Sequence, residues 1–135
     1  MSAMTDYLAA VRGILDHLER TQLDRLDAAA GLVVRALTGG GAIHCAGIGH
    51  GNEGDFLNRA GGLAAVQPFT WSFTVNTPVA DALKNRPDPD PVDRECAAIR
   101  LAFQTGNLRA GDVMLLSSVS GRNKGPIELA LACRE

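Results

Sequence analysis

The sequence predicts a single α/β domain with a parallel sheet that is covered on both faces. Two observations predict this class: residues 5–37 repeat apolar side chains at helical spacing, and residues 41–135 alternate short apolar runs with glycine- or serine-rich loops and helical segments. A length of 135 residues with 46% hydrophobic residues suffices for one core and leaves little room for a second. We therefore expect one domain over 1–135, with a helical arm over about 5–38 and a sheet-forming part over about 41–135.

Charge and cysteine content exclude several classes of protein. Thirteen Lys and Arg are offset by fifteen Asp and Glu, with no long run of either sign, so a nucleic-acid partner is not expected. No stretch reaches the roughly 18 consecutive apolar residues of a membrane span, so no membrane partner is expected. Cys45, Cys96 and Cys133 are odd in number and widely spaced, which favours reduced thiols in a cytoplasmic protein over disulfides or a zinc site. The sequence predicts no cofactor.

The helical arm contains two apolar series that differ in phase. The slip between them predicts two consecutive helices, with Thr5 capping the first and Thr21–Asp24 starting the second. The glycines at 39–41 end the second helix because consecutive glycines are poor helix formers. The first series is Leu8, Val11, Leu15 and Leu18, and the second is Leu23, Leu26, Ala30, Val33 and Leu37.

The first half of the sheet-forming part has the pattern strand, helix, strand. Residues 42–46 form a short apolar run that opens into the glycine-rich residues 47–52, which is typical of a buried strand ending in a tight loop. A helix is predicted over 53–60, closed by two glycines, and a second strand over 63–66. This order predicts a right-handed crossover and parallel pairing.

The second half begins with a surface excursion over residues 69–92. Its first residues alternate like an edge strand, but its proline-rich end cannot form regular structure. A helix follows over 93–105, a strand over 112–117, and a helix over 126–132 with Pro126 in its first turn. The third strand would leave an open, apolar sheet edge, from which we expect a truncated domain.

The loop after the third predicted strand has the composition of an anion-binding site. In a parallel sheet it lies at the carboxyl edge, where the backbone N–H groups of a loop and helix start favour a phosphate. Ser118 and Ser120 add hydroxyl donors, and Arg122 and Lys124 add positive charge. The alternative is a turn whose serines only cap the helix. Because a cap needs one hydroxyl, this density of donors favours binding.

The loop after the first predicted strand gives a weaker signal. Gly47 and Gly49 begin a Gly-x-Gly pattern, but Asn52 stands where the dinucleotide-binding fingerprint has its third glycine. Glu53 and Asp55 place negative charge where a phosphate is not favoured. The chain also has no Gly-Lys-Ser/Thr triplet of a nucleotide P-loop.

One stretch resembles the phosphosugar-binding loop of sugar isomerase (SIS) domains, particularly the uncharacterised branch with Ser-Gly-Arg-Asn followed by Pro and Glu. It is Gly-Asp-Val-Met-Leu-Leu-Ser-Ser-Val-Ser-Gly-Arg-Asn-Lys-Gly-Pro-Ile-Glu-Leu-Ala-Leu, residues 111–131. Gly49-His50 and residues 59–63 resemble that branch's first strand, loop and helix, and the likeness covers roughly residues 5–135. It implies a three-layer α/β/α sandwich with a mainly five-stranded parallel sheet, a dimer formed through N-terminal helices, and a sugar phosphate bound at the strand ends.

The resemblance also assigns site residues. The family's Ser-x-Ser-Gly-x-Ser/Thr phosphate motif falls on Ser118, Ser120 and Gly121, with Asn123 at its last position, where an amide still donates. The serine that commonly follows Gly-His is Gly51 in this chain. The expected phosphate site comprises Ser118, Ser120, Gly121, Arg122 and Asn123, and the expected sugar end comprises Gly49, His50 and Asn52.

Aldose–ketose isomerisation needs a base that moves a proton between adjacent carbons, and His50, Glu53 and Glu128 are the catalytic candidates. His50 can titrate near neutrality or instead bond to backbone, and both glutamates have an alternative as capping or solvated helix residues. His44 is expected to be a core histidine. A metal held by His44, His50 and Asp55 is not expected because their spacing is not a ligand pattern.

Three functions stay open on this basis. The favoured function is binding of a phosphorylated sugar or sugar derivative by a homodimer or higher homo-oligomer, with turnover left open, and the first hypothesis built on it is an aldose–ketose isomerase. The second is a non-catalytic sugar-phosphate-sensing or assembly module. The third is an oligomeric scaffold built from the N-terminal helices.

Overall fold

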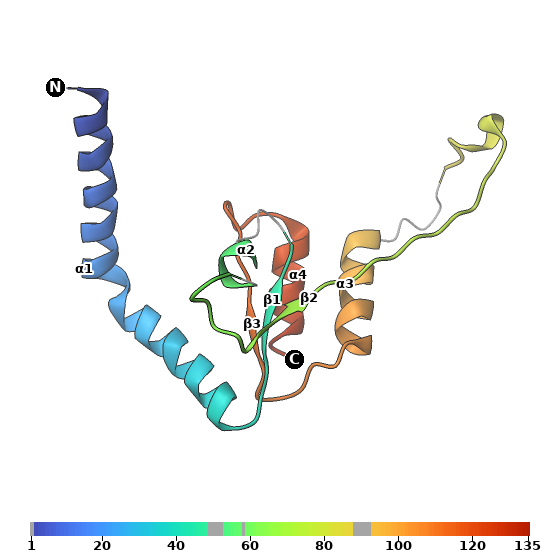
Figure 1. Ribbon diagram of the computed structural model, residues 1–135. Helices are drawn as coiled ribbons and strands as arrows, with labels where there is room; N and C mark the ends of the chain where they lie inside the picture. The colour runs from blue at the N-terminus through green and yellow to red at the C-terminus, as the bar shows by residue number, and fades with distance from the viewer. Residues whose placement is uncertain (1, 49–52, 58, 88–92) are drawn as a thin grey trace.

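The computed structural model of the chain describes residues 2–48, 53–57, 59–87 and 93–135 (Figure 1). Its centre is a sheet of three parallel strands in the order β2-β1-β3. The strands are β1 (Ile43–Ala46), β2 (Val66–Phe69) and β3 (Val113–Leu115). Ile43 lies opposite both Val66 and Val113, so β1 is the central strand. The predicted α/β class with a parallel sheet is confirmed.

The N-terminal arm is one continuous helix, α1 (Ala3–Thr38), so the prediction of two helices is wrong. Ser2 caps it, and the hydroxyl of Thr21 donates to the carbonyl of His17 at 2.8 Å, within the helix, instead of starting a new one. Such hydroxyl bonds to the preceding turn often bend helices, and Figure 1 shows α1 changing direction about half-way along. The slip of phase therefore places the two apolar series on different sides of one helix.

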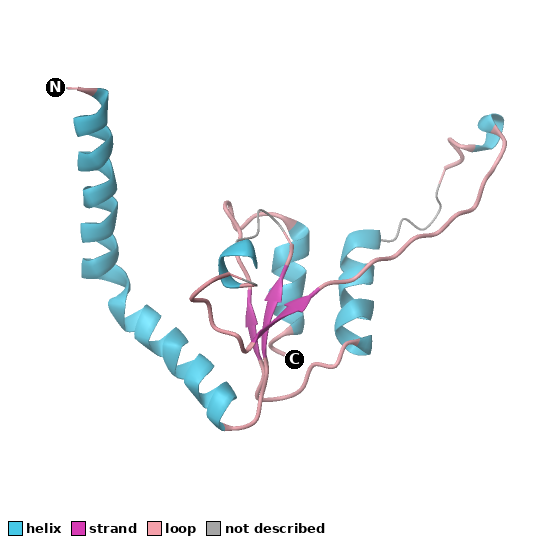
Figure 2. Cartoon of the chain, viewed as in Figure 1, coloured by secondary structure: helices cyan, strands magenta, loops and turns pink. Residues whose placement is uncertain are grey.

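Helices cover both faces of the sheet, as the predicted three layers require. On one face α3 (Arg94–Thr105) and α4 (Lys124–Ala132) pack side by side, whereas α1 lies on the other side of the strands (Figure 2). The core beneath α3 and α4 comprises Ala46, Phe69, Ile99 and Leu129. The smaller core on the other face comprises Ile43, Cys45 and Val66, joined by Val33 of α1 and by Leu57.

Several boundaries differ from the predicted ones: β3 is shorter than the predicted strand 112–117, and α4 begins two residues before the predicted helix 126–132. Helix α2 (Glu53–Phe56) is shorter than the predicted helix 53–60, because a turn with Gly61 at φ +75° follows it. Strand β2 starts only at Val66, whose amide donates to the carbonyl of Leu63 at 3.2 Å, so that residues 63–65 form a turn. Pro68 lies within β2, where the edge position tolerates a residue without an N–H group.

The segment between β2 and α3 forms the expected surface excursion. Within its described residues, 70–87, the regular structure is the short 3₁₀ helix η1 (Asp81–Leu83), and nearly all side chains are exposed. Figure 1 shows this segment leaving the sheet and extending beyond α3. The remainder of the proline-rich stretch, residues 88–92, lies outside the described residues. In the described part of the chain, no helix combines the length and apolarity that crossing a bilayer requires.

Candidate functional site at the carboxyl edge of the sheet

Gly47 and Ile48, the described residues that follow β1, lie at the same edge of the sheet as the loop after β3, because these strands are parallel neighbours. Contact between the two segments is direct. A methyl group added at Gly125, in the first turn of α4, would lie 2.8 Å from Cδ1 of Ile48, which follows β1. The same methyl would collide with the carboxylate of Glu95 in the first turn of α3. Gly125 therefore allows three segments to meet at this edge.

The loop after β3 is organised by its own serines. Oγ of Ser118 accepts a hydrogen bond from the amide of Gly121 at 3.1 Å, and Oγ of Ser120 accepts one from the amide of Arg122 at 3.3 Å. Gly121 has φ +62°, a conformation that favours glycine. These two amides are thus satisfied within the loop, and both serine hydroxyls keep a hydrogen to donate. Because residues 119–124 are exposed, a ligand can reach these donors from solvent.

The start of α4 differs from the starts of the other long helices. Helices α1 and α3 are capped by the side chains of Ser2 and Asp93, and each has an acidic residue in its first turn. The N-cap residue of α4, Asn123, makes no side-chain cap bond, and the first turn of α4 holds no acidic residue. The start of α4 thus has no side-chain cap and no acidic residue of its own, although the carboxylates of Glu95 and Asp93 at the start of α3 lie against Gly125 and Lys124.

An ion pair holds the starts of α3 and α4 together. Nζ of Lys124 donates to Oδ2 of Asp93 at 2.8 Å. The hydrogen bond from Lys124 lowers the pKa of Asp93, with help from the amide of Cys96, and Asp93 in turn raises the pKa of Lys124. The ammonium group that the sequence suggested for an anion is therefore shared with Asp93, whereas Arg122 extends from the exposed loop.

Of the first-loop residues, the structure describes Glu53 but not Gly49, His50 and Asn52, which lie outside the described residues. Glu53 begins α2, and its Oε1 would lie 3.5 Å from a methyl group at Gly47. Its other oxygen, Oε2, is buried and has no hydrogen-bond partner among the described residues. Burial raises the pKa of the Cys45 thiol, and the Glu53 carboxylate raises it further, which places this carboxylate beside the end of β1.

Glu128 and His44 lie apart from the two loops. The carboxylate of Glu128 pairs with the guanidinium of Arg100 on α3, which raises the pKa of Arg100, and Arg100 also contacts Glu135 at 2.5 Å. His44 contacts Asp112, which precedes β3 at the opposite edge of the sheet. Among the residues that the structure describes, no three His, Cys, Asp or Glu side chains cluster closely enough to hold a metal ion.

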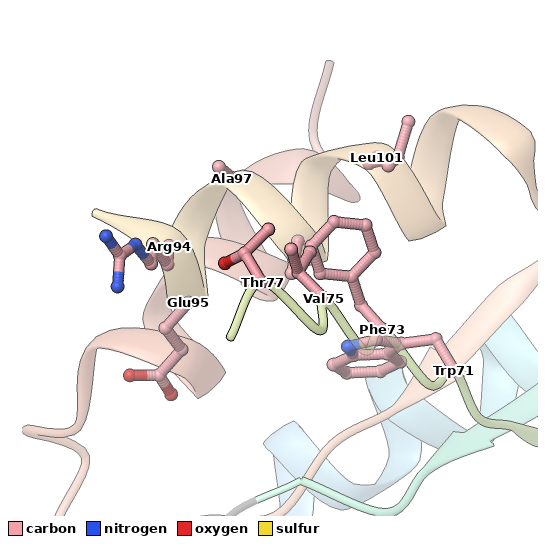
Figure 3. Close-up of a pocket in the computed structure, with 9 residues that line it drawn as sticks. Trp71, Phe73, Val75, Thr77, Arg94, Glu95, Ala97 and Leu101 are labelled. Atoms are coloured by element: carbon pink, nitrogen blue, oxygen red, sulfur yellow. The ribbon is translucent and has the colours of Figure 1, made fainter. Parts of the chain in front are cut away.

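The sequence reasoning missed two features near this edge. One is the role of Gly125, for which the Gly-Pro pair at the helix start was the available signal. The other is a groove of about 820 Å³ between the excursion and α3, lined by Trp71, Phe73 and Val75 on one side (Figure 3). The alternation of these apolar residues was visible in the sequence, but their partner helix was not.

Comparisons with known proteins cover nearly the whole chain. A family model described as SIS domain matches residues 6–135. A UPF0309 protein of Streptomyces coelicolor is 29% identical over 130 residues, which make up 95% of this chain and 50% of that protein. A UPF0309 protein of Halalkalibacterium halodurans is 30% identical over 136 residues, 98% of this chain and 53% of that protein. The chain thus spans about half the length of the curated relatives it matches. No solved structure matches it significantly.

Proposed function

This chain belongs to the SIS domain family, and from that membership and the open start of α4 we propose that it binds a phosphorylated sugar or sugar derivative at the carboxyl edge of its sheet. Binding of carbohydrate derivatives is a general property of this family. The proposed phosphate site comprises Ser118, Ser120, Gly121, Arg122 and Asn123, and the proposed sugar end comprises Gly49, His50 and Asn52.

The observation that carries the proposal is the start of α4, which has no side-chain cap and no acidic residue in its own first turn. A phosphate there receives the unsatisfied N–H groups of a helix start and the favourable end of the dipole. The hydroxyl hydrogens of Ser118 and Ser120 and the guanidinium of Arg122 supply further donors from the preceding loop. Pro126 has no N–H group, so the donors concentrate on the loop and the very first residues of the helix.

The sugar end of the ligand would face a hydrogen-bond acceptor, the Glu53 carboxylate, whereas the phosphate end would face the donors of the loop after β3. Within the part of the chain that the structure describes, the buried Oε2 of Glu53 lacks a hydrogen-bond partner, and leaving such a group unpaired is costly. Donors at one loop and a carboxylate at the adjacent loop fit a ligand that carries phosphate at one end and hydroxyl groups at the other.

The proposed reaction is aldose–ketose isomerisation. A base takes the proton from carbon 2 of the aldose and returns it to carbon 1 of the enediolate, while a second proton passes between the oxygens, so no external reductant or oxidant is needed. His50, Glu53 and Glu128 remain the proposed candidates for this base. Glu53 is favoured over Glu128, because its Oε2 has no hydrogen-bond partner among the described residues, whereas the carboxylate of Glu128 is paired with Arg100.

A second candidate is a non-catalytic sugar-phosphate sensor or assembly module. One observation favours it: much of α1 exposes large apolar side chains, which suits association with another protein surface. We propose a homodimer on this basis in either case. The three free cysteines further support a cytoplasmic location for the protein.

Thermal melting with a panel of aldose and ketose phosphates tests the binding proposal. Sugar phosphates are expected to raise the melting temperature, and the same sugars without phosphate are not. The double variant Ser120→Ala/Arg122→Ala is expected to lose this stabilisation, whereas the control Ser72→Ala/Arg25→Ala, which changes the same residue types elsewhere, keeps it. Full stabilisation of the loop variant would contradict the proposal.

Deuterium incorporation into the substrate distinguishes an isomerase from a non-catalytic sensing module. In heavy water an isomerase incorporates deuterium at carbon 2 of its substrate, which NMR detects. Stabilisation by a sugar phosphate without exchange would support the sensing module and contradict the isomerase.

A further inference from the structure

Glu95, in the first turn of α3, places a carboxylate against the start of α4, where the phosphate site is proposed. A methyl group added at Gly125 would collide with Oε1 of Glu95 and would lie 3.3 Å from its carboxyl carbon, Cδ. The hydrogen bond with Asp93 is the main cause that raises the pKa of Lys124, and the negative charge of Glu95 adds a smaller part. An acidic side chain thus lies beside the site at which an anion is expected.

Space, and not backbone conformation, requires a glycine at position 125. Gly125 is buried in the first turn of α4, and its φ lies outside the left-handed region that favours glycine. Its Cβ position is instead approached by the carboxylate of Glu95 and by Cδ1 of Ile48, the latter at 2.8 Å. Because a side chain at this position would push the carboxylate away from the helix start, Gly125 is what allows Glu95 to lie there.

The start of α4 offers few backbone donors to an anion. Pro126 has no N–H group, and the amide of Ile127 donates to the carbonyl of Asn123 at 3.4 Å. The amides of Lys124 and Gly125 remain, since no described group accepts a hydrogen bond from them. The amide nitrogen and the Cβ position of Gly125 belong to the same Cα, so an anion held by this amide is a neighbour of the Glu95 carboxylate.

The other charged groups near Glu95 do not pair with it. The ammonium group of Lys124 donates to Asp93 at 2.8 Å. Arg94 lies with Glu95 and Thr77 at the polar end of the groove along α3, and Figure 3 shows the guanidinium and the Glu95 carboxylate extending in different directions. No hydrogen bond or ion pair joins Glu95 to another residue that the structure describes. Its exposed carboxylate can therefore accept a hydrogen bond from a ligand.

A carboxylate beside an anion site repels an anion without a proton and accepts a hydrogen bond from an anion that carries one. The second pKa of a phosphate monoester is about 6, so near this pH many molecules keep a P–O–H group. A sulfate ester is fully ionised under the same conditions and has only acceptor oxygens. Because hydrogen bonds between a hydroxyl and a carboxylate are short and strong, the carboxylate distinguishes two anions of the same tetrahedral shape.

We propose that Glu95 is a selectivity residue of the phosphate site, which accepts the hydrogen of a protonated phosphate and disfavours sulfate and other fully ionised oxyanions. This inference rests on the proposed function and narrows its ligand to phosphate esters. Asp93 cannot take the same role, because its carboxylate is already paired with Lys124.

An NMR titration tests the proposal with inorganic phosphate and inorganic sulfate as probes. Both salts are added at pH 6 and at constant ionic strength, and the amide signals of Gly121, Lys124 and Gly125 report the dissociation constants. The unmodified protein is expected to bind phosphate more tightly than sulfate. Glu95→Gln is expected to lower this preference by roughly 10-fold or more, chiefly through tighter sulfate binding, because the neutral amide can donate to sulfate and still accept from phosphate.

Two further variants separate the charge of Glu95 from its packing. Glu95→Asp keeps the carboxylate and is expected to keep the preference for phosphate, and Glu19→Gln removes a carboxylate from an exposed position of α1 and is expected to change neither constant. Circular dichroism checks that each variant is folded.

Three results would overturn the selectivity role and leave the phosphate site in place. They are equal binding of both anions by the unmodified protein, an unchanged preference in Glu95→Gln, and an equal gain for both anions in this variant, which would indicate general repulsion. Absence of binding of either anion to the unmodified protein and to Glu95→Gln would overturn the proposed phosphate site itself, and the role of Glu95 with it.

Discussion

The imidazole Nε2 of His44 lies 3.3 Å from Oδ2 of Asp112, which joins the central strand to the turn before β3. The same carboxylate accepts hydrogen bonds from the amides of Ala42, at 2.7 Å, and Arg109, at 2.9 Å. The side chains of His44 and Asp112 are only 14% and 12% exposed. The carboxylate of Asp112 thus links the amino-terminal ends of β1 and β3 by hydrogen bonds, at the edge of the sheet opposite the proposed ligand site.

Replacing Asp112 with Asn is expected to lower the free energy of unfolding by about 2 kcal/mol at pH 7, because Asn cannot accept at both positions. The amide of Ala42 is the main cause that lowers the pKa of Asp112 from its ordinary 3.8. A depressed pKa stabilises the fold above the ordinary value, and this contribution is lost as the pH falls from near 3.8 through the lower folded value. Urea unfolding at pH 7 and pH 3 should show the difference between the two proteins shrinking in acid. A difference that grows in acid would contradict this assignment.

Gly125→Ala is expected to cost roughly 1–3 kcal/mol, because the new methyl group meets the Glu95 carboxylate and the end of Ile48. The double variant Gly125→Ala/Glu95→Ala lacks the Glu95 carboxylate and should recover part of the lost free energy of unfolding. Gly13→Ala is the matched control, since nothing lies within 4 Å of the added methyl and the position is helical, so it should stabilise by roughly 0.5–1 kcal/mol. Thermal and urea unfolding measure all three. Equal stability of Gly125→Ala and the unmodified protein would show that the three segments do not meet closely.

Glu53→Gln is expected to raise the free energy of unfolding by about 1 kcal/mol in the absence of ligand, because it removes a charge whose buried oxygen has no partner in the described ranges of the chain. The same change should reduce the stabilisation given by a sugar phosphate. Asp55→Gln, two residues further along α2, provides a nearby carboxylate control. Urea unfolding with and without ligand tests both effects, and a Glu53→Gln protein that is less stable without ligand would indicate a structural role for the carboxylate.

Glu128→Gln is expected to destabilise the protein by about 1 kcal/mol and to leave the response to sugar phosphates unchanged, since its carboxylate pairs with Arg100 between α3 and α4. Glu135→Gln removes the more exposed partner of the same guanidinium and should have a smaller effect. Melting temperatures with and without ligand provide the measurement. Loss of deuterium exchange at carbon 2 in a stable Glu128→Gln protein would instead make Glu128 the base.

The sequence predicted the parallel sheet, α3 and α4 because each of these elements carries its own local signal. Asp93 marks the start of α3, Pro126 fits the first turn of α4, and the apolar run that includes β3 is bounded by polar residues. The loop after β3 could be proposed as an anion-binding site for the same reason, since its hydrogen-bond donors lie within a few consecutive residues.

The continuous course of α1 and the two ion pairs could not be predicted, because they depend on contacts that local sequence patterns do not contain. Residues 3–38 form one helix, in which the Thr21 hydroxyl donates to the carbonyl of His17, and a slip of phase in the apolar pattern cannot distinguish such a continuous helix from two separate ones. The pairing of Lys124 with Asp93 joins residues 31 positions apart, and the ion pair of Glu128 joins residues 28 positions apart. Neither partner is identifiable until α3 and α4 are placed side by side.

The two borders of the sheet differ in what they offer to a neighbouring strand. Pro68 deprives β2 of one backbone donor, whereas the all-apolar β3 keeps its complete set of peptide groups along the other border. Unwanted strand pairing between copies would therefore start at β3. A lysine introduced into this edge strand would disfavour such pairing, as Pro68 already does in β2.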